Sequence, residues 1–372
     1  MSKKIFLCIV VIFLSALQGK AEVVVPTISD IVDNLETIEN KIFSRDRVYV
    51  KYTSVVAENK LSTKKEEQYR SVTYSNVKDK NSWGVRAILA EPVKNKTGET
   101  VFFARGGKIF EWTANSKSVV IVPFQFGRNM YQDWTFFLNI GITPFRKIAE
   151  TNGTSFDKVL DEVEREPSLE VLGYFVLPDS IKNNIKKYQV NPVQEEVDGH
   201  KCWVVEWKNA DKIWFDSNLS GVIRKRIIHW EEGKEVKRVI VNSGFKEFGD
   251  GVVLPMKQEV TNYVGEKMGL SKSLLGKQHS HFIYQVDSIQ FDNFDKEAEE
   301  LSNYSLSPGT SVLDVANELE YTITKPNSDP FAGPISQGIT VNRYVMFRAI
   351  FIISGSILIF IGVWSKLRNK KA

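Results

Sequence analysis

The fold is decided by residues 188 to 264, which read YQVNPVQEEVDGHKCWVVEWKNADKIWFDSNLSGVIRKRIIHWEEGKEVKRVIVNSGFKEFGDGVVLPMKQEVTNYV. Runs rich in Val, Ile, Trp and Phe alternate there with short polar segments, a pattern typical of β-strands. Asp198-Gly199, Glu232-Gly233 and Asp250-Gly251 separate the runs at hairpin spacing. The stretch therefore predicts an antiparallel meander.

One helix and a second group of strands are predicted ahead of this meander. Apolar residues recur at helical spacing from Ile28 to Ile42, with Thr27 or Ser29 as the cap and Asp30 in the first turn. The strands are predicted at residues 47–56, 67–75, 83–92, 100–112 (with a hairpin turn at Gly106-Gly107) and 118–123. Residues 282–291, FIYQVDSIQF, are predicted as the closing strand.

Alternation within two of these strands predicts one apolar face of the sheet. Successive side chains of a strand point to opposite faces, so every second residue shares a face. Two explanations stay open for such a face: its rings pack a core against the helices, or they line a cavity for a lipid. The candidate ligand-binding residues are Val48, Val50, Tyr52, Trp203, Val205 and Trp207.

The segment from about residue 128 to 188 interrupts the strands. Short helical patterns occur in it, broken by Gly, Pro and Asn. Its apolar stripes are Phe136, Phe137, Ile140 and Phe145, followed by Phe156, Val159, Leu160 and Val163. We interpret the segment as an amphipathic helical insert.

The run from Lys212 to Pro255 resembles the second half of the outer-membrane lipoprotein carrier, or lipoprotein-sorting (LolA/LolB-like), superfamily. The likeness rests on IWFDSNLSGVIRKRI, on the EEGKE hairpin and on VIVNSGFKEFGDGVVLPMKQE. RGGKIFEW, at 105 to 112, is similar to the Asp-Gly-Lys hairpin of the first half, with Arg105 in place of the usual acid. The resemblance implies a mainly β (α+β) fold: a strongly curved antiparallel sheet, an unclosed half-barrel whose concave face is covered by helices and can enclose acyl chains.

Two features depart from that family. Its carriers are soluble, whereas this chain is predicted to be tethered, and the insert at 128–188 has no counterpart that matches residue by residue. Tethered, enlarged relatives of this kind occur in planctomycete-like bacteria, with a final stretch similar to SPGTSVLDVANELEYTI at 307–323.

Both ends of the chain predict a membrane protein. Residues 344 to 365 are mostly apolar and long enough to cross about 30 Å of hydrocarbon, and basic residues follow them. Residues 1 to 21 have the pattern of a cleaved signal peptide, with an uncleaved anchor as the alternative. The predicted organisation is a signal peptide (1–21), a periplasmic curved-sheet domain (22–324), a flexible stem (325–343), a single transmembrane helix (344–365) and a basic cytoplasmic tail (366–372).

The charge and cysteine content of the domain exclude some classes of function. The whole chain has 49 basic and 45 acidic residues, but nine of the basic ones lie in 1–21 and 343–372, which leaves 40 against 45 in between. We therefore expect no nucleic-acid partner. Cys202 is the one cysteine left after the predicted cleavage, so no disulfide framework is expected.

Chemistry-bearing motifs are weak in this sequence. His279 and His281 fall on one face of a strand without an identifiable third metal ligand. GLSKSLLGKQ, at 269–278, looks like a phosphate loop, but Gln278 stands where Ser or Thr is required. No catalytic residue, metal or cofactor is predicted, and the protein is not expected to be an enzyme.

The sequence thus predicts a membrane-anchored envelope protein that binds a hydrophobic ligand, either a lipid or the acyl chains of a lipoprotein, without covalent chemistry. The expected partners are the bilayer, such a ligand and possible envelope proteins. The alternative is a structural or signalling ectodomain in which the sheet supports protein–protein contacts.

Overall fold

The computed structural model describes residues 24–59, 67–77, 80–91, 96–105, 108–113, 118–123 and 177–325, without 220, 231–234, 269, 304, 316 and 318. The predicted signal peptide, transmembrane helix and tail lie outside these ranges, as do most of the insert and of the stem. Within the described ranges, no helix combines the length and the apolar character that crossing a bilayer requires.

The described elements are mainly strands. The helices are α2 (Ile28–Phe43), α8 (Leu177–Asn183) and α9 (Lys296–Ser302), with 3-10 turns η1 (Glu266–Met268) and η2 (Lys272–Leu274). The first strands are β1 (Arg47–Asn59), β2 (Glu67–Val77), β3 (Lys80–Glu91), β4 (Lys96–Arg105), β5 (Lys108–Thr113) and β6 (Ser118–Pro123). The later strands are β7 (Tyr188–Val190), β8 (Glu195–Val197), β9 (His200–Trp207), β10 (Asp211–Asp216), β11 (Ile223–His229), β12 (Val236–Ser243), β13 (Lys246–Glu247), β14 (Val253–Leu254), β15 (Lys257–Tyr263), β16 (Gln278–Phe291), β17 (Ser311–Asp314) and β18 (Leu319–Thr322).

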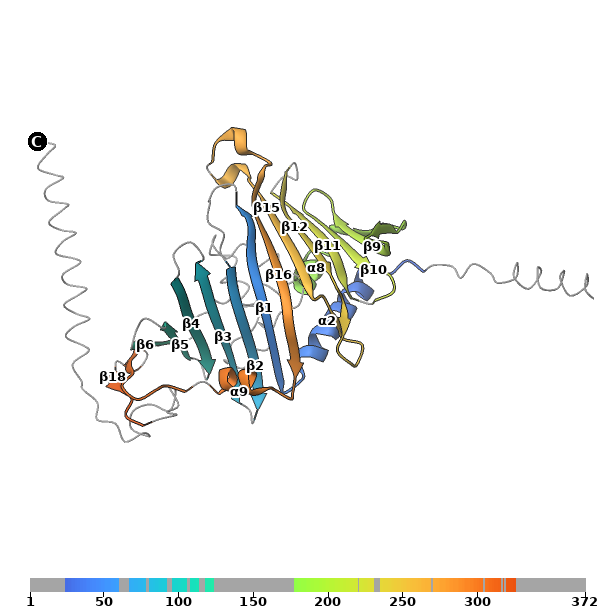
Figure 1. Ribbon diagram of the computed structural model, residues 1–372. Helices are drawn as coiled ribbons and strands as arrows, with labels where there is room; N and C mark the ends of the chain where they lie inside the picture. The colour runs from blue at the N-terminus through green and yellow to red at the C-terminus, as the bar shows by residue number, and fades with distance from the viewer. Residues whose placement is uncertain are drawn as a thin grey trace, which may run out of the picture.

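Sixteen of these strands form one open sheet, and β13 and β14 form a separate small one (Figure 1). The strand order is β18-β17-β6-β5-β4-β3-β2-β1-β16-β15-β12-β11-β10-β9-β7, with β8 also paired to β9. Its two ends, β18 and β7, do not pair with each other in the part of the chain that the structure describes. The predicted mainly β class and the unclosed sheet are thus confirmed.

The last strands depart from the prediction. β16, predicted as the closing strand, lies at the centre and pairs with β1 on one side and β15 on the other. β17 pairs with β6 in parallel, although an antiparallel sheet was predicted. It has four residues, which is the lower limit of length at which alternation indicates a strand, so its pattern was too short to predict it.

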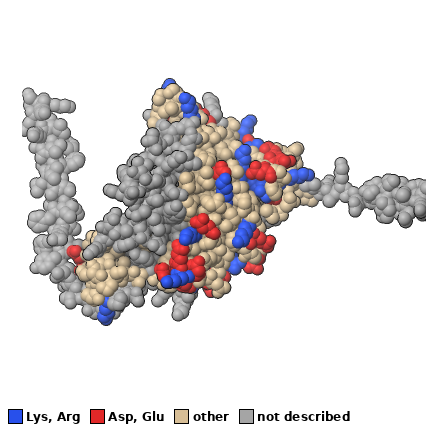
Figure 2. All heavy atoms as spheres, viewed as in Figure 1, with Lys and Arg blue, Asp and Glu red and all other residues tan. Residues whose placement is uncertain are grey.

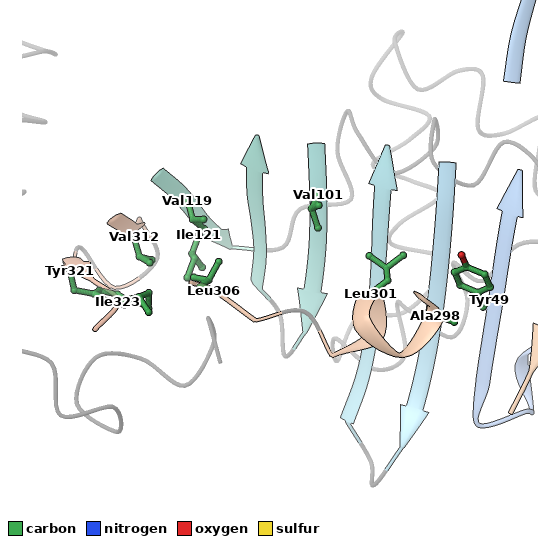
Figure 3. Close-up of a cluster of buried hydrophobic side chains, with 10 residues drawn as sticks. All are labelled: Tyr49, Val101, Val119, Ile121, Ala298, Leu301, Leu306, Val312, Tyr321 and Ile323. Atoms are coloured by element: carbon green, nitrogen blue, oxygen red, sulfur yellow. The ribbon is translucent and has the colours of Figure 1, made fainter. Parts of the chain in front are cut away.

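The two faces of the sheet carry different elements. We call the face that bears Val50 and Val205 the α2 face, because Val205 packs there against α2 and α8. We call the other the α9 face, because Tyr49 packs there with Ala298 and Leu301 of α9 (Figure 3). α9 and the segment after it thus cover the face of the β1–β6 half opposite the α2 face, a second cover that was not predicted.

Helix α2 begins as its sequence predicts. The Thr27 hydroxyl accepts a hydrogen bond from the Asp30 backbone N–H, and the Asp30 carboxylate accepts one from the Thr27 N–H at 2.7 Å. This capping box satisfies two N–H groups that a helix end leaves unpaired. The hydrogen bonds from Thr27 also lower the pKa of Asp30. The helix then buries the face that carries Ile31 and Leu35.

The turn between β10 and β11 contacts α2 and permits its close approach to the sheet. The Asp216 carboxylate accepts hydrogen bonds from the backbone N–H groups of Asn218 and Leu219, at 2.8 and 3.1 Å, which fixes the turn. Gly221 follows with a φ of +74°, and a Cβ atom there would lie 2.6 Å from Ile38 Cδ1 and 3.2 Å from the Asn34 carbonyl oxygen of α2. Glycine therefore permits both the backbone conformation and the close approach of the helix.

We expect Gly221→Ala to destabilise the protein more than Gly199→Ala. Both glycines have a left-handed φ, but a Cβ at Gly199 meets nothing within 4 Å. Gly199→Ala should cost about 1–2 kcal/mol for the conformation alone, and Gly221→Ala roughly 1–3 kcal/mol more for the displaced helix. Urea unfolding of the two variants measures the difference. Equal losses would show that α2 does not approach this turn closely.

Candidate functional site

The six candidate ligand-binding residues lie on the α2 face. Cross-strand neighbours share a face, and one row of neighbours crosses the sheet from β9 to β1. The row consists of Val205, Ile213, Arg226, Ile240, Val260 and Phe282, and Val286 on the same face of β16 pairs with Tyr52 of β1. Five of the six candidates are buried, at 0 to 8% exposure, and Trp207 is half-buried.

The structure does not bring the two groups of candidates together. Val48, Val50 and Tyr52 lie on β1, and five strands separate β1 from β9, which carries the other three. At about 4.8 Å per strand this is roughly 29 Å along the sheet. In the β9 group, Val205 packs against Ile31 and Leu35 of α2, and the half-buried Trp207 packs against the same cluster.

An aromatic group that the sequence analysis did not single out lies beside Tyr52. Phe282 and Tyr284 of β16 are both half-buried, and their rings stack with centroids 6.3 Å apart. The Tyr284 ring lies 6.1 Å from that of Tyr52. We call Tyr52, Phe282 and Tyr284 the central aromatic group. The alternation of Phe282, Tyr284 and Val286 within FIYQVDSIQF was the signal that could have identified it.

The opposite face of these central strands is polar. Thr261 Oγ1 lies 2.9 Å from His281 Nδ1, and Lys257 Nζ lies 2.6 Å from Glu259 Oε1. Thr53 donates a hydrogen bond to Asp287 at 3.2 Å. The central strands are therefore mainly polar on the α9 face, whereas their α2 face carries rings and aliphatic side chains with a few buried polar groups.

Strands β9 and β10 differ, because they are buried on both faces. Cys202, Val204 and Trp214 form a separate cluster on the face opposite Val205, and each is at most 5% exposed. The Trp214 Nε1–H donates a hydrogen bond to Glu195 Oε2 at 2.8 Å, and Lys212 Nζ lies 4.6 Å from the Trp214 ring centroid. The interpretation of this strand as apolar on one face only is thus wrong.

A buried ion pair holds β10 to β11 on the α2 face. Arg226 donates to both carboxylate oxygens of Asp211, at 3.0 and 2.6 Å, and each residue is 1% exposed. The Tyr188 hydroxyl donates to Asp211 Oδ2 at 3.1 Å. This bidentate geometry balances the loss of hydration that burial imposes on both charges.

Cys202 is the nearest approach to a nucleophile in the described ranges, and its surroundings suppress that role. Asp216 pairs in register with Cys202 and lies 3.8 Å from His200 Nδ1. The pKa of the Cys202 thiol is raised to about 11, first by burial and then by the Asp216 charge. The thiol is therefore protonated at neutral pH and hidden from substrate. Asp216 is already bound by the buried Arg224.

The histidines do not assemble a metal site in the described residues. His281 contacts Thr261 and lies 3.7 Å from Glu259 Oε2, and His279 lies 3.3 Å from Ser280. No cluster of three potential metal ligands occurs among the residues that the structure describes.

Comparison with known sequences gives little. No family model matches the chain. A stretch of 87 residues, 22% of this chain, is 33% identical to a galactose-1-phosphate uridylyltransferase from Staphylococcus carnosus. The match spans only 16% of the length of that protein.

Comparison with solved structures finds proteins of about 10% identity to this chain. A putative outer membrane lipoprotein-sorting protein domain from Vibrio parahaemolyticus has a TM-score of 0.37 at 10% identity, and covers 73% of this chain and 96% of its own. A LolA superfamily protein from Nitrosomonas europaea has a TM-score of 0.36 at 9% identity, over 72% and 96%. LprF from Mycobacterium bovis has a TM-score of 0.24 at 10% identity, over 73% and 97%. These TM-scores are too low to establish a shared fold, so membership of the superfamily stays a prediction.

We expect Arg226→Met to destabilise the protein by about 3–5 kcal/mol, because the variant leaves the Asp211 charge buried without its partner. The double variant Asp211→Leu/Arg226→Met removes both charges and should recover much of that loss. Urea unfolding of the two variants and the wild type measures the coupling. A double variant as unstable as Arg226→Met would show that packing, and not the unpaired charge, determines the loss.

Proposed function

We propose that this protein binds an apolar ligand, a lipid or the acyl chains of a lipoprotein, on the α2 face of its central strands. The observation that carries the proposal is the central aromatic group: Phe282 and Tyr284 stay half-buried on a face where Tyr52 and Val260 are almost fully buried. Aromatic surface that remains accessible within a buried apolar face offers an apolar ligand large contact area without reorganisation. Val48, Val50 and Tyr52 form the β1 side of this site.

A few buried polar groups accompany the rings. In cross-strand register, Tyr284 stands between Ser54 and Gln258, which are 8% and 0% exposed. Ser280, at 3%, precedes Phe282 on the same face. Binding sites for apolar ligands combine mainly hydrophobic walls with a small number of such polar groups, which orient the ligand. These residues are suited to a ligand that carries a polar head group.

The site performs no covalent chemistry in this proposal. Support comes from Cys202, whose thiol is kept protonated and buried.

The domain is periplasmic and anchored by residues 344–365, with the C-terminus in the cytoplasm, as the sequence at both ends favours. A scaffold for envelope proteins is the competing function, and the ligand measurements below separate the two.

The full-length protein, kept in solution by an amphipathic polymer, should bind a fluorescent derivative of palmitic acid. Tyr284→Ala should weaken binding about tenfold, because it removes a ring whose burial is worth roughly 1.5 kcal/mol or more. Ile283→Ala is the matched control, since Ile283 is half-buried on the same strand but faces the opposite side. It should leave the affinity unchanged.

Unlabelled palmitate at about 100 times its dissociation constant should also stabilise the wild type by about 2.7 kcal/mol. The rise in melting temperature should be smaller for Tyr284→Ala than for Ile283→Ala. If neither palmitate nor its fluorescent derivative binds the wild type, the scaffold function replaces this proposal. Equal losses of palmitate affinity in the two variants would show that the ligand does not bind at the central aromatic group.

The proposed topology has its own test. Protease added to the periplasmic side of the inner membrane should degrade residues 22–340 and spare a fragment of a few kilodaltons. An antibody against an epitope at the C-terminus detects that fragment. Full protection of the domain from the protease would show that the domain has the opposite orientation.

A further inference from the structure

The loop between β15 and β16 projects beyond the ends of the strands. It comprises residues 264–277 and contains η1 and η2; Figure 1 shows it at the top of the molecule. We call it the tip. The segment that contains β13 and β14 lies at the opposite end of the same strands, because it joins the end of β12 to the start of β15. The tip is therefore a terminal feature of the sheet.

The surface of the tip combines apolar and basic side chains. Met268 is 38% exposed, and Leu270, Leu274 and Leu275 are half-buried. Residues 264–277 contain three lysines and one acidic residue, Glu266. Lys272 and Lys277 are exposed, and Figure 2 shows basic side chains at the top of the molecule, where the tip lies.

Backbone hydrogen bonds hold the tip in one conformation. The Val264 N–H donates to the Lys277 carbonyl and the Gly276 N–H donates to the Val264 carbonyl, both at 2.9 Å. At its base, a Cβ atom on Gly265 would lie 2.3 Å from the Trp230 ring, so this glycine is needed for the ring to pack against the backbone. These contacts fix the base of the tip, and a loop that is partly fixed before binding loses less entropy on binding.

We propose that the tip docks on the surface of a bilayer that contains anionic lipids. Met268 and the three leucines enter the boundary between head groups and acyl chains, while Lys272 and Lys277 contact lipid phosphates. Apolar side chains interspersed with lysines favour this partner, because burial of apolar surface and attraction to anionic head groups act together there. A protein partner would need a surface evolved to combine an apolar centre with an acidic rim. A bilayer with anionic lipids has both features, since its interior is apolar and its head groups are negatively charged.

The tip leads directly into the strand that carries the central aromatic group. β16 starts at Gln278, and Phe282 and Tyr284 follow four and six residues later. At 3.3 Å per residue they lie roughly 13–20 Å from the tip end of the strand, within reach of an acyl chain leaving the bilayer. Passage of a lipid along this strand rests on the proposed function, whereas docking of the tip does not.

The test measures how deep the tip lies in a membrane. Met268→Cys, in a Cys8→Ser background, is labelled with an environment-sensitive fluorophore, since the buried Cys202 thiol with its raised pKa labels slowly. The full-length chain is reconstituted in vesicles of phosphatidylcholine and phosphatidylglycerol that contain nitroxide-labelled lipids. We expect quenching at position 268. A label at Lys246→Cys, on β13 at the other end of the strands, is the control and should stay unquenched.

Two variants identify the contributions of charge and apolar surface. Lys272→Glu/Lys277→Glu should remove most of the quenching at 268, because each lysine near an anionic surface contributes about fivefold in affinity. Leu270→Asp should do the same, with its melting temperature confirming that the domain is folded. Any one of three results overturns the proposal. The label at 268 is not quenched, the labels at 268 and 246 are quenched equally, or the quenching at 268 survives charge reversal. A blue shift at 268 without quenching marks a protein contact and overturns it as well. The palmitate measurements contain no vesicles, so failure of docking and failure of ligand binding are distinguishable.

Discussion

The pairing of β16 with β1 and β15 is the interaction on which the rest of the structure depends. It joins strands β1–β6 to the group from β7 to β15, and both halves would end in an unpaired edge without it. Its register links Val48 to Phe291, which are 243 positions apart in the sequence. Closing so long a loop costs more conformational entropy than forming the local hairpins does. The long ladder and the burial along the α2 face must offset that cost, which explains why β16 is the longest of the described strands.

A cluster of charged and aromatic side chains reinforces the end of this pairing. Arg47 makes two hydrogen bonds to the Glu299 carboxylate, at 2.5 and 2.6 Å, and its guanidinium lies 4.2 Å from the Phe294 ring centroid. The contact with Arg47 lowers the pKa of Glu299. Arg45 stacks in the same way at 4.7 Å from Phe291. Exposed ion pairs contribute little alone, but planar guanidinium groups that also stack on rings fix the corner where β1 begins and β16 ends.

Local patterns predicted the strands from β1 to β6 and β16, and the meander that follows residue 188, because side-chain alternation is a property of each strand by itself. The short strands β17 and β18 were not predicted. The same patterns also placed Trp203 and Val205 on one face. The position of β16 could not be predicted, because nothing within FIYQVDSIQF specifies which distant strands it pairs with. Burial of the opposite face of β9 was missed for the same reason, since Trp214 reaches Cys202 and Val204 from a neighbouring strand. The ligand-binding role of the candidate residues stays a prediction. Alternation placed Val48, Val50 and Tyr52 on one face of β1, but the distance from β1 to β9 depends on strand order.

Burial is distributed so that the centre of the sheet differs from β9–β10. Both faces are buried at β9–β10, so a change on one face there disturbs packing on the other. The central strands have a polar second face and do not share this constraint. β16 is held by Arg45 at its Phe291 end, and Phe282 and Tyr284 lie toward its other end. In the proposed function, a ligand that approaches from the tip would meet the part of the α2 face where rings are accessible and where packing constrains the sheet from one side only. The proposed binding would exchange water for ligand at the rings and leave the two-sided packing of β9–β10 intact.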